Sequence, residues 1–122
     1  MGDAFFFDSY ALVEILRGNQ AYSKYLSSAP VTTKLNLFEV CHALLRETSL
    51  NEAEDFLDDY YAFAFDFDKE AVLEAAVLRF KLKKRNLSMT DCIGYILSQR
   101  LGIPFLTGDE QFKDLPNVEF VK

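Results

Sequence analysis

The chain has 122 residues, a net charge of −6 and a composition that is 50% hydrophobic. This composition excludes a disordered chain, and no apolar run is long enough to span a bilayer, so we expect no membrane association. The acidic balance argues against a general nucleic-acid coat protein, which would be basic. We expect one domain over residues 1–122. Because the N-terminus lacks the features of a signal peptide, we expect a cytoplasmic protein.

Hydrophobic periodicity and helix-capping residues divide the chain into short strands and helices. In chain order, the predicted elements are a strand at 4–7, helices at 9–17 and 19–28, a strand at 31–33, helices at 35–47 and 49–61, a strand or extended segment at 64–67, helices at 68–85 and 88–101, and strands at 103–106 and 118–121. Strands that alternate with helices predict a parallel sheet covered on both faces. We therefore expect an α/β fold.

Two of the predicted strands are followed closely by a carboxylate. Asp8 follows the first strand, and Asp109 follows the strand that begins at Ile103. Two more acids, Glu39 and Asp91, lie near the starts of predicted helices. Because open α/β sheets bind ligands at the carboxyl ends of their strands, we expect these four acids at one edge of the sheet.

Each acid also has a structural explanation when it is taken alone. Asp8 and Asp109 stand where helix N-caps stand. Asp91 fits the third position of a capping box, and Glu39 lies near the positive end of its helix. As a set, however, they repel: two charges about 6 Å apart oppose each other by roughly 3 kcal/mol at an effective dielectric near 20. Either the acids are further apart than this, or protons or a hard cation such as Mg²⁺ or Mn²⁺ relieve the repulsion.

The single histidine and the two cysteines indicate no further site. Glu39 and His42 have the Glu-x-x-His spacing of di-iron bundles, but the motif occurs only once and this chain has strands, so we interpret His42 as structural. Cys41 and Cys92 lack metal-binding spacing and are expected to be buried free thiols. No Gly-rich phosphate loop is present.

In their order and spacing, the four acids resemble the PIN domain and, within it, the small VapC-type toxins of toxin–antitoxin pairs. The matching pieces are Phe7-Asp8-Ser9, Asn36-Leu-Phe-Glu39-Val, Thr90-Asp91-Cys-Ile and Thr107-Gly-Asp109-Glu-Gln-Phe112. The resemblance implies a three-layer α/β/α sandwich with a central parallel sheet of about five strands. It also implies a Mg²⁺- or Mn²⁺-dependent endoribonuclease that hydrolyses single-stranded RNA with a metal-activated water.

The resemblance further implies roles for residues and a set of partners. The catalytic and metal-binding residues would be Asp8, Glu39, Asp91 and Asp109, and the supporting residues would be Thr107, Ser9 and Asn36. The implied partners are the RNA substrate, a second copy in a homodimer and a cognate small antitoxin. A basic stretch is either a solvated helix end or a contact for RNA phosphates; it comprises Lys81, Lys83, Lys84 and Arg85. A housekeeping PIN nuclease in ribosomal RNA processing and an inactive PIN-like binding module remain alternative functions.

Overall fold

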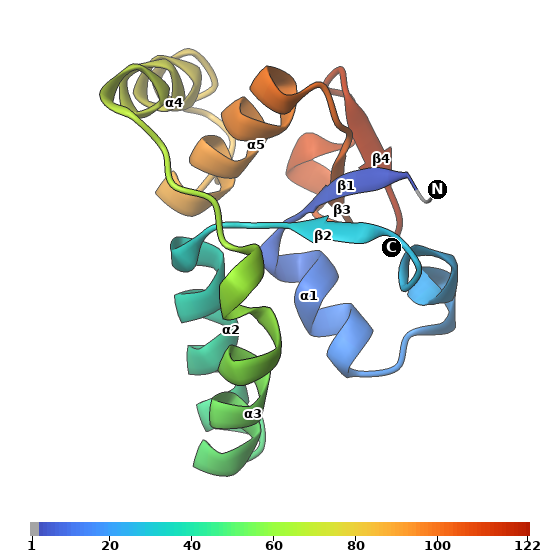
Figure 1. Cartoon of the computed structure of the whole chain (residues 1–122). Coiled ribbons are helices and arrows are strands. Elements are labelled where there is room, and N and C mark those ends of the chain that lie inside the picture. The colour runs from blue at the N-terminus through green and yellow to red at the C-terminus, as the bar shows by residue number, and fades with distance from the viewer. Residues whose placement is uncertain (1–2) are drawn as a thin grey trace.

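A computed structural model describes residues 3–122 of the chain, and its strands form one parallel four-stranded sheet (Figure 1). The strands are β1 (Ala4–Phe7), β2 (Ala29–Val31), β3 (Phe105–Thr107) and β4 (Val118–Phe120). Their order across the sheet is β2-β1-β3-β4, and every neighbouring pair is parallel. The two central strands, β1 and β3, are therefore the ones that lie beneath the helices on both faces.

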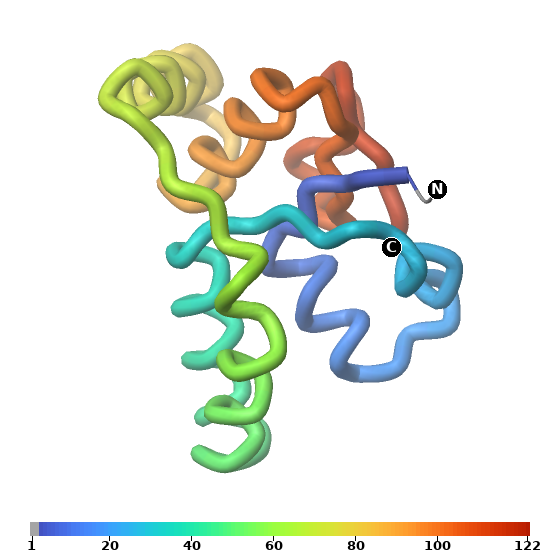
Figure 2. The backbone as a smooth tube through the Cα atoms, in the orientation of Figure 1, coloured from blue at the N-terminus to red at the C-terminus, as the bar shows by residue number. Residues whose placement is uncertain are grey.

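Helices cover both faces of this sheet. The α-helices are α1 (Ser9–Leu16), α2 (Lys34–Glu47), α3 (Leu50–Tyr60), α4 (Lys69–Lys81) and α5 (Met89–Leu101), and the short 3-10 helices are η1 (Gln20–Tyr25), η2 (Tyr61–Phe63) and η3 (Glu110–Phe112). In Figure 1, α1, α2 and α3 lie on one side of the sheet, and α4 and α5 lie on the other. Figure 2 follows the chain from α3 past the end of β2 to α4. The predicted α/β fold with a covered parallel sheet is confirmed.

Neighbouring residues of the central strands enter two different cores. Phe6 and its register partner Phe105 pack with α4 and α5, whereas Phe7 and its partner Leu106 pack with α1 and α2. Side chains alternate between the faces of a strand, so a strand that is covered on both sides must be apolar at consecutive positions. This explains the run of three phenylalanines in β1.

Helix α5 lies unusually close to the sheet at Gly94. A Cβ atom on Gly94 would stand 2.7 Å from a ring carbon of Phe6, which is closer than real Cβ atoms approach. The missing side chain lets the helix pack directly on β1, and the stretch from Cys92 to Ser98 is buried. This close packing holds the first turn of α5 beside the end of β1.

The expected sheet of about five strands has four, because the segment at 64–67 does not become a strand. It forms a single parallel bridge, in which the Phe65 N–H donates to the Thr32 carbonyl over 2.8 Å. Beyond that bridge, the chain that follows β2 turns away from the sheet, since Thr33 caps the start of α2. Within residues 3–122, the segment at 64–67 pairs with the sheet through this bridge alone.

Several element boundaries also differ from prediction: the helix expected at 19–28 is the shorter 3-10 helix η1, the strand expected at 31–33 is β2 at 29–31, and the strand expected at 103–106 is β3 at 105–107. Pro30 lies within β2 instead of ending a helix, which is possible because β2 is an edge strand and the missing N–H breaks no ladder. Helix α4 ends at Lys81, and Arg85 lies in the following turn. Among residues 3–122, no helix combines the length and the apolar character needed to cross a membrane.

Candidate active site

The four acids lie at the edge of the sheet where β1 and β3 end. The chain leaves β1 for β2 on one side, and β3 lies on the other side of β1, so the strand order reverses between them. Such switch points are where open α/β sheets bind ligands. Like-charge interactions connect the set: Asp8 with Asp91 and Asp109, and Asp91 with Asp109 and Glu39. The structure thus brings together the acids that come from four separate parts of the chain.

Asp8 is the most deeply buried of these acids, with 1% of its surface exposed. It caps helix α1, and its Oδ1 accepts a hydrogen bond from the Ala11 N–H over 2.8 Å. Burial raises the pKa of Asp8 to about 8, although hydrogen bonds from Thr107 and Ala11 oppose the rise. Without a cation, this carboxyl therefore keeps its proton near neutral pH. The proton removes one negative charge and so reduces the repulsion among the four acids.

Asp91 is partly buried in the first turn of α5, where its side chain caps the start of that helix. Its Oδ2 accepts from the Ser88 N–H at 3.3 Å, and its own N–H donates to the Ser88 hydroxyl at 3.0 Å. This is the reciprocal capping box that the sequence predicts. Burial raises the pKa of Asp91 to about 6 against the effect of the Ser88 bonds, and the charges of Asp109 and Glu39 raise it further.

A chain of hydrogen bonds holds Glu39 in place. The Ser9 hydroxyl donates to Oε1 of Glu39 over 2.6 Å and accepts from the Asn36 side-chain amide at 3.1 Å. The Oδ1 of Asn36 in turn accepts from the Thr33 hydroxyl at 2.6 Å. Asn36 and Thr33 are fully buried, so the chain is anchored in the core. The sequence does not indicate Thr33 as a site residue, because its pattern predicts a strand at 31–33.

Thr107 connects Asp8 with Asp109. Its hydroxyl oxygen accepts from the Asp109 N–H over 3.0 Å, and the hydroxyl group is also a hydrogen-bond partner of Asp8. The residue between them has to be glycine, because a Cβ atom on Gly108 would stand 2.2 Å from a ring carbon of Tyr10. The Thr-Gly-Asp sequence is thereby explained by close packing of α1 against this turn.

The donors at this edge fit a hard divalent cation in their chemistry. Within residues 3–122, no three His, Cys, Asp or Glu side chains already stand together as ligands of one metal ion. The available donors, however, are carboxylate and hydroxyl oxygens, which Mg²⁺ and Mn²⁺ prefer. The capping bonds use only one oxygen of each acid, namely Oδ1 of Asp8, Oδ2 of Asp91 and Oδ1 of Asp109. A bound cation would also relieve the effects that raise the pKa values of Asp8 and Asp91.

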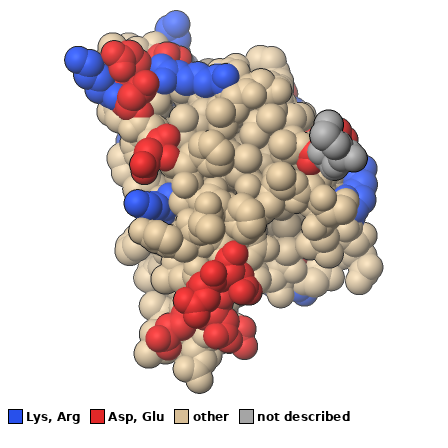
Figure 3. All heavy atoms as spheres, in the orientation of Figure 1, with Lys and Arg blue, Asp and Glu red and all other residues tan. Residues whose placement is uncertain are grey.

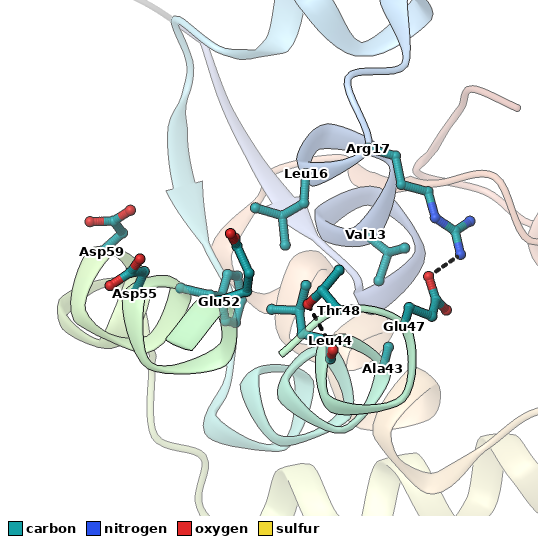
Figure 4. A pocket seen from close by; sticks show the side chains of 11 residues that line it. Val13, Leu16, Arg17, Ala43, Leu44, Glu47, Thr48, Glu52, Asp55 and Asp59 are labelled. Atoms are coloured by element: carbon teal, nitrogen blue, oxygen red, sulfur yellow. Dashed lines mark hydrogen bonds and ion pairs between the residues drawn. The ribbon is translucent and has the colours of Figure 1, made fainter. Parts of the chain in front are cut away.

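Two neighbouring clefts lie along α1 and α2, and one of them is lined by residues of this site. One, of about 290 Å³, is lined by Ser9, Glu39 and Arg46 among others. The other has a similar volume of about 290 Å³ and lies between α1, α2 and α3 (Figure 4). Both clefts are lined by Val13, Arg17, Ala43 and Glu47, so they are neighbours on α1 and α2, and the first of them reaches Glu39. We call the two clefts together the α1–α2 channel.

The basic stretch divides into one engaged and three exposed side chains. Arg85 forms a bidentate ion pair with Asp114 and donates to the Gln111 carbonyl. The other three, Lys81, Lys83 and Lys84, are exposed.

The remaining candidates of the sequence lie outside the acidic site. His42 is exposed, stacks on Phe38 and lies 3.0 Å from a guanidinium nitrogen of Arg46. Both cysteines are free thiols, and of the two Cys92 is the buried one. Neither feature adds a donor to the four acids.

Comparison with known proteins identifies the family. Residues 5–118 match the PIN domain family. Two solved structures share the fold: a toxin–antitoxin complex from Klebsiella pneumoniae, with a TM-score of 0.73, 17% identity and 96% of each chain covered, and VapBC2 from Rickettsia felis bound to a DNA fragment from its promoter, with a TM-score of 0.71, 15% identity and 97% of each chain covered. No curated protein matches the sequence. The chain belongs to the PIN domain family.

Proposed function

We propose that this protein is a metal-dependent endoribonuclease and the toxin of a VapBC-type toxin–antitoxin pair, acting in the cytoplasm. PIN domains are nucleases, and the chain belongs to that family. The observation that carries the proposal is the set of four acids at the switch point, where two carboxyl pKa values are raised. The similarity in fold to a toxin–antitoxin complex and to VapBC2 supports the toxin assignment.

Each residue near the site has a role in the proposed mechanism. Asp8 and Asp91 would hold Mg²⁺ or Mn²⁺, with Glu39 and Asp109 binding directly or through water. When bound, the cation supplies Lewis acidity for hydrolysis of the phosphodiester. The supporting side chains fix the acids: the Ser9 hydroxyl and the Asn36 amide orient Glu39, and the Thr107 hydroxyl orients Asp8 and Asp109.

A cleavage assay with single-stranded RNA tests this proposal. The wild-type protein should cut RNA with Mn²⁺ or Mg²⁺ and not in EDTA, and Asp8→Asn and Asp91→Asn should abolish cutting while the fold remains. Asn is also a good N-cap, so the first substitution preserves the start of α1. Asp3→Asn, at an exposed acid that precedes β1 and so lies at the opposite end of that strand from Asp8, is the matched control and should cut normally. Undiminished cleavage by either site variant, or by the wild type in EDTA, would exclude the proposed chemistry.

The α1–α2 channel supports the antitoxin as partner. Its floor is apolar, with Val13, Leu16 and Phe56 among its lining residues, and acids of α3 line its far end (Figure 4). Figure 3 shows an acidic surface over α3, and the acids of α3 that line the channel are Glu52, Asp55 and Asp59. An amphipathic segment with Lys or Arg on its polar side fits this pattern, because the apolar side fills the floor and the cations pair with the rim.

A segment long enough to cover both clefts would also block the site, since Ser9 and Glu39 line one of them. Leu16→Glu would place a charge on the floor, so it should abolish co-purification with the small protein encoded beside the gene and leave RNA cleavage intact. The homodimer is a further part of the proposal, supported by exposed apolar side chains such as Phe38 and Leu45 on α2. Light scattering of the purified protein measures it directly.

One observation favours an inactive binding module as the second candidate. Three of the four acids accept hydrogen bonds from backbone N–H groups at helix starts, namely Asp8, Asp91 and Asp109. This capping role is purely structural. A binding module would retain this task without catalysis. The cleavage assay separates the two, because only the nuclease loses a measurable activity in Asp8→Asn.

A further inference from the structure

A second groove lies between α4 and α5, on the face of the sheet opposite the α1–α2 channel. Its volume is about 420 Å³, within the range of about 300–1,000 Å³ that is typical of small-ligand sites. Most of its lining is apolar, and Arg79 is its charged lining residue. Two lining side chains, Phe80 and Met89, are 70% and 57% exposed. Large apolar side chains with this exposure indicate a surface that binds something.

Phe80 has the surroundings of a stacking platform for a nucleobase. It lies in the last turn of α4, and the ammonium group of Lys83 stands 4.9 Å from the centroid of its ring. Proteins that bind single-stranded nucleic acids combine exposed aromatic rings, on which bases stack, with cations that follow the phosphates. An aromatic ring and a cation are thus presented together at the edge of the groove.

The charge around the groove selects an anionic occupant. No acid occurs between Glu74 and Asp91, although the whole chain carries −6. Arg85 is neutralised by Asp114, but no other basic residue of the stretch forms an ion pair within residues 3–122. A second copy related by two-fold symmetry would bring the same cations face to face. A polyanion is therefore favoured over a second copy.

The groove and the acids lie around the same turn of α5. Met89 lines the groove, whereas Asp91, two residues later, belongs to the acidic set. A nucleic-acid strand that passes the start of α5 would therefore meet both. We propose that the α4–α5 groove binds a base of single-stranded RNA that flanks the scissile phosphate, with Phe80 stacking on the base and Lys83 contacting the backbone. This inference rests on the proposed ribonuclease function.

The test compares two labelled oligonucleotides by fluorescence anisotropy in EDTA, so that neither is cut. One is a short single-stranded RNA, and the other is the same ribose-phosphate chain without bases. Phe80→Ala should weaken binding of the base-bearing RNA about fivefold or more and leave binding of the abasic chain unchanged. Phe80→Tyr keeps the ring and should restore affinity. Lys83→Ala should weaken both probes.

Leu73→Ala is the matched control, because Leu73 lies on the same helix and is 66% exposed but does not line the groove. It should bind both probes like the wild type. If the wild type and Phe80→Ala bind the base-bearing RNA with equal affinity, the proposed subsite is wrong. If Phe80→Ala also changes the oligomeric state, the groove binds a second copy. If the wild type cuts RNA and Phe80→Ala binds normally, only the subsite fails; if the wild type neither binds nor cuts RNA, the ribonuclease function fails with it.

Discussion

The buried carboxyls predict that the metal-free protein loses stability as the pH rises. The folded-state pKa values are about 8 for Asp8 and about 6 for Asp91, against 3.8 for an ordinary aspartate. Because these values are raised, the folded protein retains protons that the unfolded chain releases, so the free energy of unfolding falls with rising pH. Both carboxyls contribute between pH 4 and 6, and Asp8 alone contributes between pH 6 and 8.

The size of the effect follows from proton linkage. One group that is protonated only in the folded state changes stability by about 1.4 kcal/mol per pH unit. From pH 6 to 8, Asp8 therefore accounts for a loss of at most about 2.7 kcal/mol, which is a large part of the about 5–15 kcal/mol that stabilises a typical domain. Mn²⁺ should reverse the loss at pH 8 more than at pH 6, because it competes with the proton for the carboxylate.

Urea unfolding in EDTA at pH 6, 7 and 8 measures this directly. The wild type should lose stability over the series, and Asp8→Asn, which cannot ionise, should be nearly flat. A wild-type stability that stays constant or rises from pH 6 to 8 would show that Asp8 is not protonated in the folded protein. An equal decline in Asp8→Asn would show that another group causes the loss.

Three further predictions concern residues around the site. Gly108→Ala should destabilise the fold by about 1–3 kcal/mol in thermal or urea unfolding, because a Cβ there would stand 2.2 Å from an aromatic ring carbon; a neutral result would mean that the turn is not tightly packed. Ser9→Ala should lower kcat about 10–100-fold with the fold retained, because Glu39 loses its 2.6 Å donor; full activity would remove Ser9 from the site. Lys84→Ala should flatten the salt dependence of RNA binding by about 0.7 in log–log slope, whereas Arg85→Ala should chiefly lower the melting temperature, since its guanidinium is bound within the fold. Equal effects of the two on the melting temperature would contradict this division.

Much of the fold could be predicted because local signals and the global structure agree. The apolar run of β1 predicts a buried parallel strand, and Ser88 with Asp91 predicts the capping box that opens α5. The four acids could be proposed as one set because they follow strand ends or lie near helix starts, and these positions predict that they lie at one edge of the sheet.

The parts that the sequence could not predict depend on contacts between distant residues. The absence of a fifth strand follows from the turn of the chain at Thr33, which also anchors Glu39 through Asn36. In the sequence Arg85 does not differ from the neighbouring lysines, because its partner, Asp114, lies 29 residues further along the chain. Neither contact can be predicted from a periodic pattern or a local motif in the sequence.

We propose that the four acids form one divalent-cation site. The most direct measurement is anomalous scattering from crystals of the protein grown with Mn²⁺. We expect a manganese peak at the carboxyl ends of β1 and β3, coordinated by oxygens of Asp8 and Asp91 and lost in Asp8→Asn. Manganese bound only at the acidic surface of α3, or absent from the end of β1 in the wild type, would contradict it.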